Sequence, residues 1–224
     1  MNFRFPVFLD ISGKDCLVAG EGFEIPAKVQ MLVDAAANVT YIHPAADPKI
    51  KALANAGLIR WEQRDFQLDD LRNRFLVITD RDDNADIFRM AEQNRTLCNS
   101  VDDPENCRFS FGSVHRQGEL SIAISTNGSA PALAVRIKEW LRREIGPEYA
   151  KLIALLKSIR PEITSRISDF AARRELWYRI VDSNALRLLR AAKPAEAEAQ
   201  IRSLIEEAVN SISRSDISGD GGSH

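Results

Sequence analysis

Short apolar runs alternate with helical periodicity over residues 14–101, and this alternation limits the fold more than any other feature of the sequence. Runs such as 16–19 and 75–78 are continuously apolar but too short for helices, so they predict buried strands. The stretch 26–37 between two such runs has apolar residues at helical spacing. Because strands that alternate with helices build a parallel sheet, we predict an α/β fold.

The remaining elements follow from the same kind of pattern. Strands are expected at 16–19, 38–42, 58–62, 75–78 and 96–101, with 58–62 at a sheet edge because its apolar and polar residues alternate. Beyond Pro104, two strand-like runs around a polar turn at 116–118 predict a hairpin. Helices are then expected at 130–145, 148–159, 162–189 and 194–212. The Ser-, Gly- and Asp-rich residues 213–224 predict a disordered tail.

The composition excludes several classes of protein. A chain of 224 residues with 45% hydrophobic residues can bury a substantial core, and a net charge of -2 gives no basic footprint for nucleic acid. No signal peptide or apolar run of about 20 residues is present, so we expect no membrane contact. The three cysteines lack metal-binding spacing and the histidines are scattered, so we expect no metal site and a cytoplasmic protein.

A Gly20-Glu21-Gly22 turn joins the first predicted strand to the first helix. Glycines at such a turn let the backbone approach a diphosphate, and the N-terminus of the helix adds partial positive charge. The same glycines also occur where the chain only turns tightly. This turn alone therefore leaves a nucleotide loop and a structural turn both open.

Two adjacent carboxylates, Asp102 and Asp103, follow the last predicted strand and precede Pro104. Asp before Pro commonly caps a turn, which is the structural interpretation. However, ligands of open α/β sheets bind at the carboxyl ends of the strands, where Asn99 and Asp102 are expected beside the glycine turn. A carboxylate held there can act as a general acid or base.

A second polar loop, residues 125–129, ends a predicted strand and precedes a helix. Asn127 or Ser129 could cap that helix, which explains the loop without any ligand. The hydroxyl groups of Ser125 and Thr126 could equally bind the carboxylates of a ligand. His43, after the second strand, is similarly either a surface turn residue or a ligand-binding one.

The chain contains a strand with a GxG turn, then Asn-x-x-Asp-x-Pro at 99–104, and then Ala-Ile-Ser-Thr-x-Gly at 123–128. With its motifs in this order, it resembles the precorrin-2 dehydrogenase and sirohydrochlorin ferrochelatase module of sirohaem synthases. The resemblance covers residues 3–145. It implies an enzyme of sirohaem biosynthesis that oxidises precorrin-2 to sirohydrochlorin with NAD. In bifunctional members it also implies insertion of ferrous iron, as a substrate, to give sirohaem.

The resemblance also implies roles for individual residues. Asp102 would be the catalytic acid/base, and the tetrapyrrole would be bound by Asn99, Ser125, Thr126 and Gly128. NAD would be bound by Gly20, Gly22, Phe23, Glu24, Pro44 and Ala45. The family forms homodimers, so a dimer is expected here as well.

Taken together, we expect four segments. Residues 1–112 would form a Rossmann-like NAD-binding domain and 113–145 a hairpin and helix for dimerisation, followed by a helical domain at 146–212 and the tail at 213–224. The chain departs from the family's usual residues at Glu21, Ile25 and Asp80. These departures motivate two alternatives to the dehydrogenase: an NAD-independent chelatase for sirohydrochlorin, and a non-catalytic tetrapyrrole-binding dimer.

Overall fold

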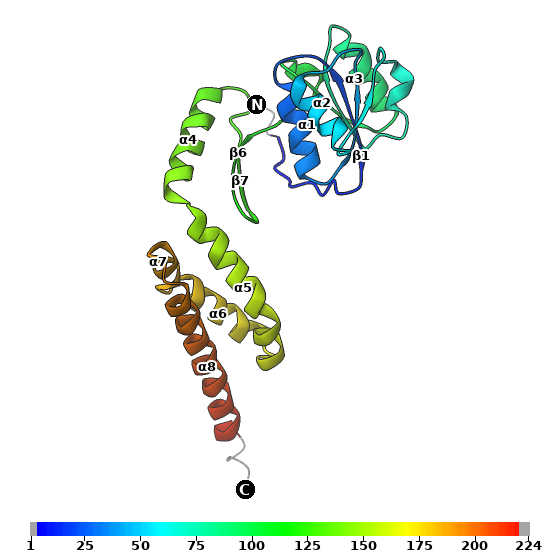
Figure 1. Cartoon of the computed structure of the whole chain (residues 1–224). Coiled ribbons are helices and arrows are strands. Elements are labelled where there is room, and N and C mark those ends of the chain that lie inside the picture. Colours follow the sequence, from blue (N-terminus) through cyan, green and yellow to red (C-terminus); the bar gives the residue numbers. More distant parts are fainter. Residues whose placement is uncertain (1–3, 220–224) are drawn as a thin grey trace. The chain divides into compact units, whose positions relative to one another are not determined.

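A computed structural model describes residues 4–219 and divides the chain into two compact units between Phe111 and Gly112. Figure 1 shows a sheet flanked by helices in the first unit, and a hairpin with a series of helices in the second. The sequence predicted this boundary one residue later, between residues 112 and 113.

The first unit is built on a five-stranded parallel sheet with strand order β3-β2-β1-β4-β5. The strands are β1 (Asp15–Gly20), β2 (Asn38–Ile42), β3 (Arg60–Glu62), β4 (Leu76–Asp80) and β5 (Leu97–Ser100). This is the predicted Rossmann-like sheet, with β3 at an edge. The order reverses at β1, so the carboxyl ends of β1 and β4 flank the switch point at which open α/β sheets bind ligands.

Helices cover both faces of this sheet and bury its apolar strands. They are α1 (Ile25–Asp34), α2 (Pro48–Asn55) and α3 (Asn84–Gln93), with short 3-10 turns η1 (Leu68–Leu71) and η2 (Pro104–Asn106). Val18 and Ile78 pack on the side of α1 and α2, while Leu17 and Val77 pack on the side of α3. Because both faces are covered, the central strands are continuously apolar rather than alternating.

The second unit begins with the predicted hairpin. Strands β6 (Ser113–Gln117) and β7 (Leu120–Ile124) pair antiparallel, with Gln117 opposite Leu120. The turn is therefore Gly118-Glu119, whereas we expected it at 116–118. Gly118 has the positive φ of 58° that such a tight turn requires. The helices that follow are α4 (Pro131–Glu144), α5 (Pro147–Arg166), α6 (Phe170–Val181), α7 (Ala185–Arg190) and α8 (Pro194–Gly219).

The helical region corrects two expectations from the sequence. First, α5 continues through Pro161, where we expected a new helix to begin. Proline has no N–H group, so the carbonyl of Lys157, four residues earlier, receives no hydrogen bond from position 161. Both residues are exposed on one helical face, so this carbonyl can accept a hydrogen bond from water. Second, the predicted helix 162–189 is divided, because Asp169 caps α6 by accepting a hydrogen bond from Ala172 N at 2.6 Å.

The predicted tail is also shorter than expected. Helix α8 extends to Gly219, so residues 213–219 are helical, although their composition had predicted disorder from 213. The reason is that no Gly or Pro interrupts the chain between Pro194 and Gly219, so nothing stops the helix earlier. The last part of the predicted tail, 220–224, lies outside the described residues.

Candidate active site at the carboxyl edge of the sheet

Four loops from neighbouring strands meet at the carboxyl edge of the parallel sheet. They follow β1, β2, β4 and β5. The glycine turn, His43 and Asp102 lie in the loops after β1, β2 and β5, and Asp80 is the last residue of β4. The register pairs Gly20 with Asp80 at the ends of β1 and β4. The glycine turn therefore lies directly beside Asp80.

The glycine turn has a geometry that only glycine allows. Gly20 has a φ of +128°, and a Cβ there would lie 2.4 Å from the Asp80 carbonyl oxygen. A Cβ on Gly22 would lie 1.5 Å from Asp80 Oδ2. No side chain caps the N-terminus of α1, which begins right after this turn. The backbone therefore suits a diphosphate, but the Asp80 side chain lies over the second glycine.

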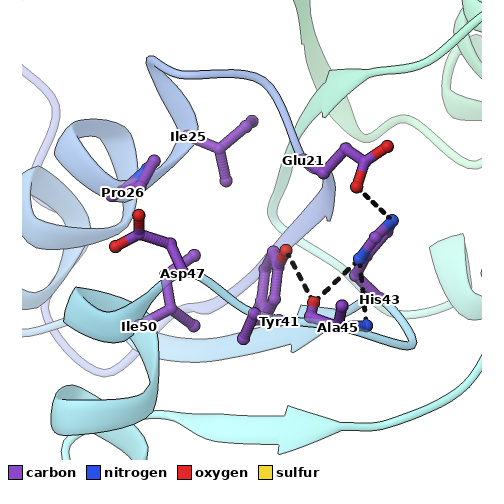
Figure 2. Close-up of a pocket in the computed structure, with 9 residues that line it drawn as sticks. Glu21, Ile25, Pro26, Tyr41, His43, Ala45, Asp47 and Ile50 are labelled. Carbon is purple, nitrogen blue, oxygen red and sulfur yellow. Dashed lines mark hydrogen bonds and ion pairs between the residues drawn. The ribbon is translucent and has the colours of Figure 1, made fainter.

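A cavity of about 300 Å³ opens between this turn and the loop after β2. Figure 2 shows its lining, which consists of Glu21, Ile25, Pro26, Tyr41, His43, Ala45, Ala46, Asp47 and Ile50. In Rossmann-like sheets the adenosine part of a dinucleotide lies beside the end of the second strand. The cavity is of the size that small-molecule sites have, and its position fits an adenosine group.

Hydrogen bonds fix the walls of the cavity. Buried Tyr41 donates from its hydroxyl to the Gly20 carbonyl at 2.8 Å and thereby ties β2 to the glycine turn. His43 Nε2 lies 3.7 Å from a Glu21 carboxylate oxygen, and its Nδ1 contacts the Ala45 carbonyl at 2.8 Å. Burial, and then the negative charges of Glu21 and Asp47, raise the pKa of Tyr41 to about 12. Tyr41 is therefore a structural donor rather than an acid at neutral pH.

Tyr41 and Asp47 line this cavity, but neither was among the residues expected at the site. Asp47 caps α2, since its Oδ1 accepts a hydrogen bond from Lys49 N at 2.8 Å, and this places a carboxylate on the cavity wall. The Asp47-Pro48 pair was a recognisable helix start that could have indicated this residue.

The six predicted cofactor residues lie on two adjoining loops. Ala45 lines the cavity, and Pro44 precedes it as an exposed residue. Gly20 and Gly22 form the turn after β1, and Phe23 and Glu24 complete the turn into α1. Phe23 is 90% exposed, whereas Glu24 pairs with Lys28 at 3.2 Å.

The two adjacent carboxylates after β5 have different environments. Asp103 Oδ2 accepts a hydrogen bond from Asn106 Nδ2 at 2.7 Å, so Asp103 is the turn residue that the Asp-Pro sequence suggested. Asp102 is exposed and has a φ of +55°. Within residues 4–219 its carboxylate has no hydrogen bond or ion pair. An exposed carboxylate without a partner at this edge lies where open α/β sheets bind their ligands.

Buried polar groups hold the loop that carries Asp102. Asn99 donates from Nδ2 to the Phe109 carbonyl at 2.9 Å, and the Ser100 hydroxyl donates to the Asn106 carbonyl at 2.9 Å. The Cys107 thiol accepts a hydrogen bond from Ser100 N at 3.2 Å, and burial raises its pKa above the usual value. Asn99, which we had predicted to contact substrate, therefore has a structural bond in this loop.

The second predicted substrate loop belongs to the other unit. Ser125 Oγ accepts from Asn127 N at 3.1 Å, and Thr126 Oγ1 accepts from Ala130 N at 3.3 Å. Capping of α4 by Asn127 or Ser129 was wrong, because its N-cap is Ala130 with no side-chain cap bond. Since both hydroxyls accept from the backbone, their O–H groups remain free to donate to a ligand.

Residues 4–219 contain no group of three or more His, Cys, Asp or Glu side chains arranged to hold a metal ion. In the same residues, no helix is both long and apolar enough to cross a membrane.

Comparison with known families accounts for nearly the whole chain. Residues 7–113 match a putative NAD(P)-binding family, 117–145 match the central region of sirohaem biosynthesis proteins, and 148–205 match the dimerisation region of sirohaem synthase. The chain belongs to the sirohaem synthase N-terminal module family. The dimerisation match covers the helices from α5 to α8, whereas we had expected the dimer segment at 113–145.

Individual sirohaem synthases are similar to the chain over most of its length. Siroheme synthase 1 of Aeromonas salmonicida is 32% identical over 184 residues, which cover 81% of this chain and 39% of the relative. The siroheme synthase of Thioalkalivibrio sulfidiphilus is 32% identical over 209 residues, covering 92% and 42%. The chain thus spans about two fifths of the length of these relatives. The solved structure of SirC, precorrin-2 dehydrogenase, matches with a TM-score of 0.73 and 26% identity over 89% of this chain and 99% of SirC.

Proposed function

We propose that the chain oxidises precorrin-2 to sirohydrochlorin with NAD as the electron acceptor. The observation that carries this proposal is the unengaged Asp102 carboxylate at the edge that also holds the glycine turn and the cavity. The structural likeness to SirC supports the same reaction. The homology to sirohaem synthases supports the same pathway.

The oxidation removes two hydrogens from the macrocycle, one as a hydride and one as a proton. When bound, NAD supplies the acceptor for the hydride. Asp102 accepts the proton, because an ionised carboxylate without a hydrogen-bond donor is available as a base. The loop bonds of Asn99 and Cys107 keep Asp102 at the carboxyl edge.

The residues that would hold NAD fall into two groups. Ala45, Glu21 and Asp47 surround the cavity that suits the adenosine part, and Gly20 and Gly22 would hold the diphosphate. The diphosphate fits once the Asp80 side chain rotates, since the group over Gly22 is the end of a side chain and not backbone. We place the tetrapyrrole carboxylates on the free hydroxyls of the 125–128 loop.

Purified protein, precorrin-2 and NAD test the dehydrogenase directly. NADH, followed by its absorbance, should appear together with the spectrum of sirohydrochlorin. A rate no higher than that of a protein-free control, with intact substrate demonstrated, would reject this activity.

A second candidate is a chelatase that needs no NAD, which the Asp80 carboxylate over Gly22 favours. Metal insertion releases two protons from pyrrole nitrogens, and Asp102 could accept them as it would in oxidation. The test is sirohydrochlorin with ferrous iron under anaerobic conditions and without NAD. Insertion no faster than the spontaneous rate would exclude it. If neither reaction occurs, tetrapyrrole binding without turnover remains as the third alternative.

We also propose that the chain acts as a homodimer. The family match to a dimerisation region covers α6, and this helix has exposed apolar residues along one face: Phe170, Tyr178 and Val181, which are 70%, 61% and 51% exposed. The core side of α6 is formed by Leu176 and Ile180, so this face is a separate one. A second copy of the chain is the partner that the dimerisation match supports.

A further inference from the structure

The carboxylate of Asp80 lies on the surface that the diphosphate of a dinucleotide would need. Oδ2 is 1.5 Å from the position of a Cβ on Gly22, so it lies in the space left by the missing side chain. In a strand–GxG–helix turn, the second glycine is the one that lets the backbone approach the diphosphate. A carboxylate and a diphosphate cannot both occupy this surface, and they carry charges of the same sign.

No basic group neutralises this carboxylate. Lys28 pairs with Glu24 at 3.2 Å, and Arg81 pairs with Asp83 at 2.8 Å. Within the described residues 4–219, Asp80 has no ion pair of its own. Burial, and then the negative charges of Asp102 and Glu24, raise the pKa of Asp80 above its usual value. Asp80 therefore places an unpaired carboxylate at the diphosphate position.

We propose that Asp80 determines the affinity of this chain for dinucleotides, because its carboxylate competes with the diphosphate for the surface of Gly22. This inference rests on the proposed use of NAD and names the residue that regulates it. The competition does not abolish binding, since the side chain can rotate away from Gly22, whereas the backbone contact at Gly20 stays in place. A neutral side chain at position 80 removes the repulsion and keeps the turn.

The test is calorimetric titration of the purified full chain with NAD, without tetrapyrrole, comparing wild type with Asp80→Asn. Asparagine has nearly the same shape, so the comparison isolates the charge. Removing one like charge several ångströms from a diphosphate should raise the NAD affinity roughly tenfold. Asp82→Asn is the matched control: it makes the same change in net charge at an exposed neighbour, and its affinity should stay within about twofold of wild type.

A titration at lower pH adds a second readout. The ratio of the two affinities should shrink as the pH falls, because Asp80 of the wild type becomes protonated. His43, Glu21, Glu24 and Asp102 lie around the same loops and are present in both proteins, so the ratio cancels their effect.

The outcomes separate this inference from the proposed function. Equal NAD affinity of wild type and Asp80→Asn, with both proteins folded, overturns the role of Asp80 and leaves NAD use intact. Absence of NAD binding by both proteins overturns NAD use and this inference together. Tighter binding by Asp80→Asn than by wild type and by Asp82→Asn supports the inference, whether or not the chain then turns over precorrin-2.

Discussion

Asp103 accepts a hydrogen bond from Asn106 at 2.7 Å, and this bond distinguishes two carboxylates that are neighbours in the sequence. It makes Asp103 part of the turn that enters η2. Asp102, one residue earlier, has a left-handed backbone and lies exposed at the end of β5. The chain therefore separates the structural carboxylate from the one available for proton transfer.

Asp102→Asn should reduce precorrin-2 oxidation by about 10²–10⁴-fold, the usual contribution of a general acid or base. Stability should hardly change, because Asn tolerates the left-handed backbone as well as Asp does. Steady-state formation of NADH and the melting temperature measure the two effects. Asp103→Asn is the control, since its amide oxygen still accepts from Asn106. Wild-type turnover by Asp102→Asn would contradict the catalytic assignment.

Asn99→Ala should destabilise the first unit by about 1–3 kcal/mol, because the Phe109 carbonyl loses its donor in a partly buried position. Denaturant unfolding measures this change. Gln93→Ala removes an exposed amide from the end of α3 and should stay within about 0.5 kcal/mol of wild type. If the two variants were equally stable, the Asn99 bond would not be what holds the 107–109 segment.

Gly20→Ala tests the close contact between β1 and β4. A Cβ at this position meets the Asp80 carbonyl and the residue has a φ of +128°, so the substitution should destabilise by more than about 2 kcal/mol. Gly57→Ala is a useful comparison, because Gly57 also has a positive φ but a Cβ there would meet open space. It should lose only about 1–2 kcal/mol. Similar losses at both positions would show that backbone conformation, and not the contact with Asp80, restricts Gly20.

The sheet was predictable from the sequence because it depends on local patterns. Buried parallel strands are short apolar runs, and the runs at 38–42 and 75–78 fall on β2 and β4 within two residues. Pro161 was misleading because a proline is a local signal too. A proline usually ends a helix, and only its exposed position on α5 shows why the helix continues.

The details of the site depend on register and were not predictable in this way. That Asp80 covers Gly22 follows from the pairing of β1 with β4, which brings together residues about 60 positions apart. Likewise, Asp47 reaches the cavity because α2 begins there, and the sequence alone did not fix the direction of that helix. The position of Asp102 at the sheet edge was predictable, because a place shortly after a strand is itself a local signal.

The ion pair between Glu148 and Arg190 should make the second unit less stable in acid. Burial alone would raise the pKa of Glu148, but the backbone N–H groups of Glu148 and Gly146 and the Arg190 guanidinium together hold it below its usual value. A lowered pKa means that the stabilisation is present above the unfolded pKa of about 4.5 and is lost as the pH falls below it.

Glu148→Gln should therefore lower the stability at pH 7 by about 1.5–3 kcal/mol, the usual contribution of hydrogen bonds to a charged group. The difference from wild type should shrink as the pH falls from 5 towards 3. Melting temperatures across this range measure it. Glu144→Gln is the control, because the hydrogen bond from Arg190 to Glu144 goes to its backbone carbonyl, which the substitution keeps. A difference that stayed constant with pH would mean that Glu148 stabilises by packing and not by charge.

A charge on the exposed face of α6 should separate the proposed dimer. Tyr178→Glu would bury an unpaired carboxylate in an apolar contact, which costs several kcal/mol and shifts the equilibrium towards monomers. Light scattering after size-exclusion chromatography gives the mass directly, and circular dichroism confirms that the helices remain. Arg179→Gln removes a charge on the side of the same helix that pairs with Glu207 of α8 at 2.7 Å, and should leave the mass unchanged. A Tyr178→Glu protein with the mass of a wild-type dimer would place the contact elsewhere, and the 113–145 segment would then be the surface to test.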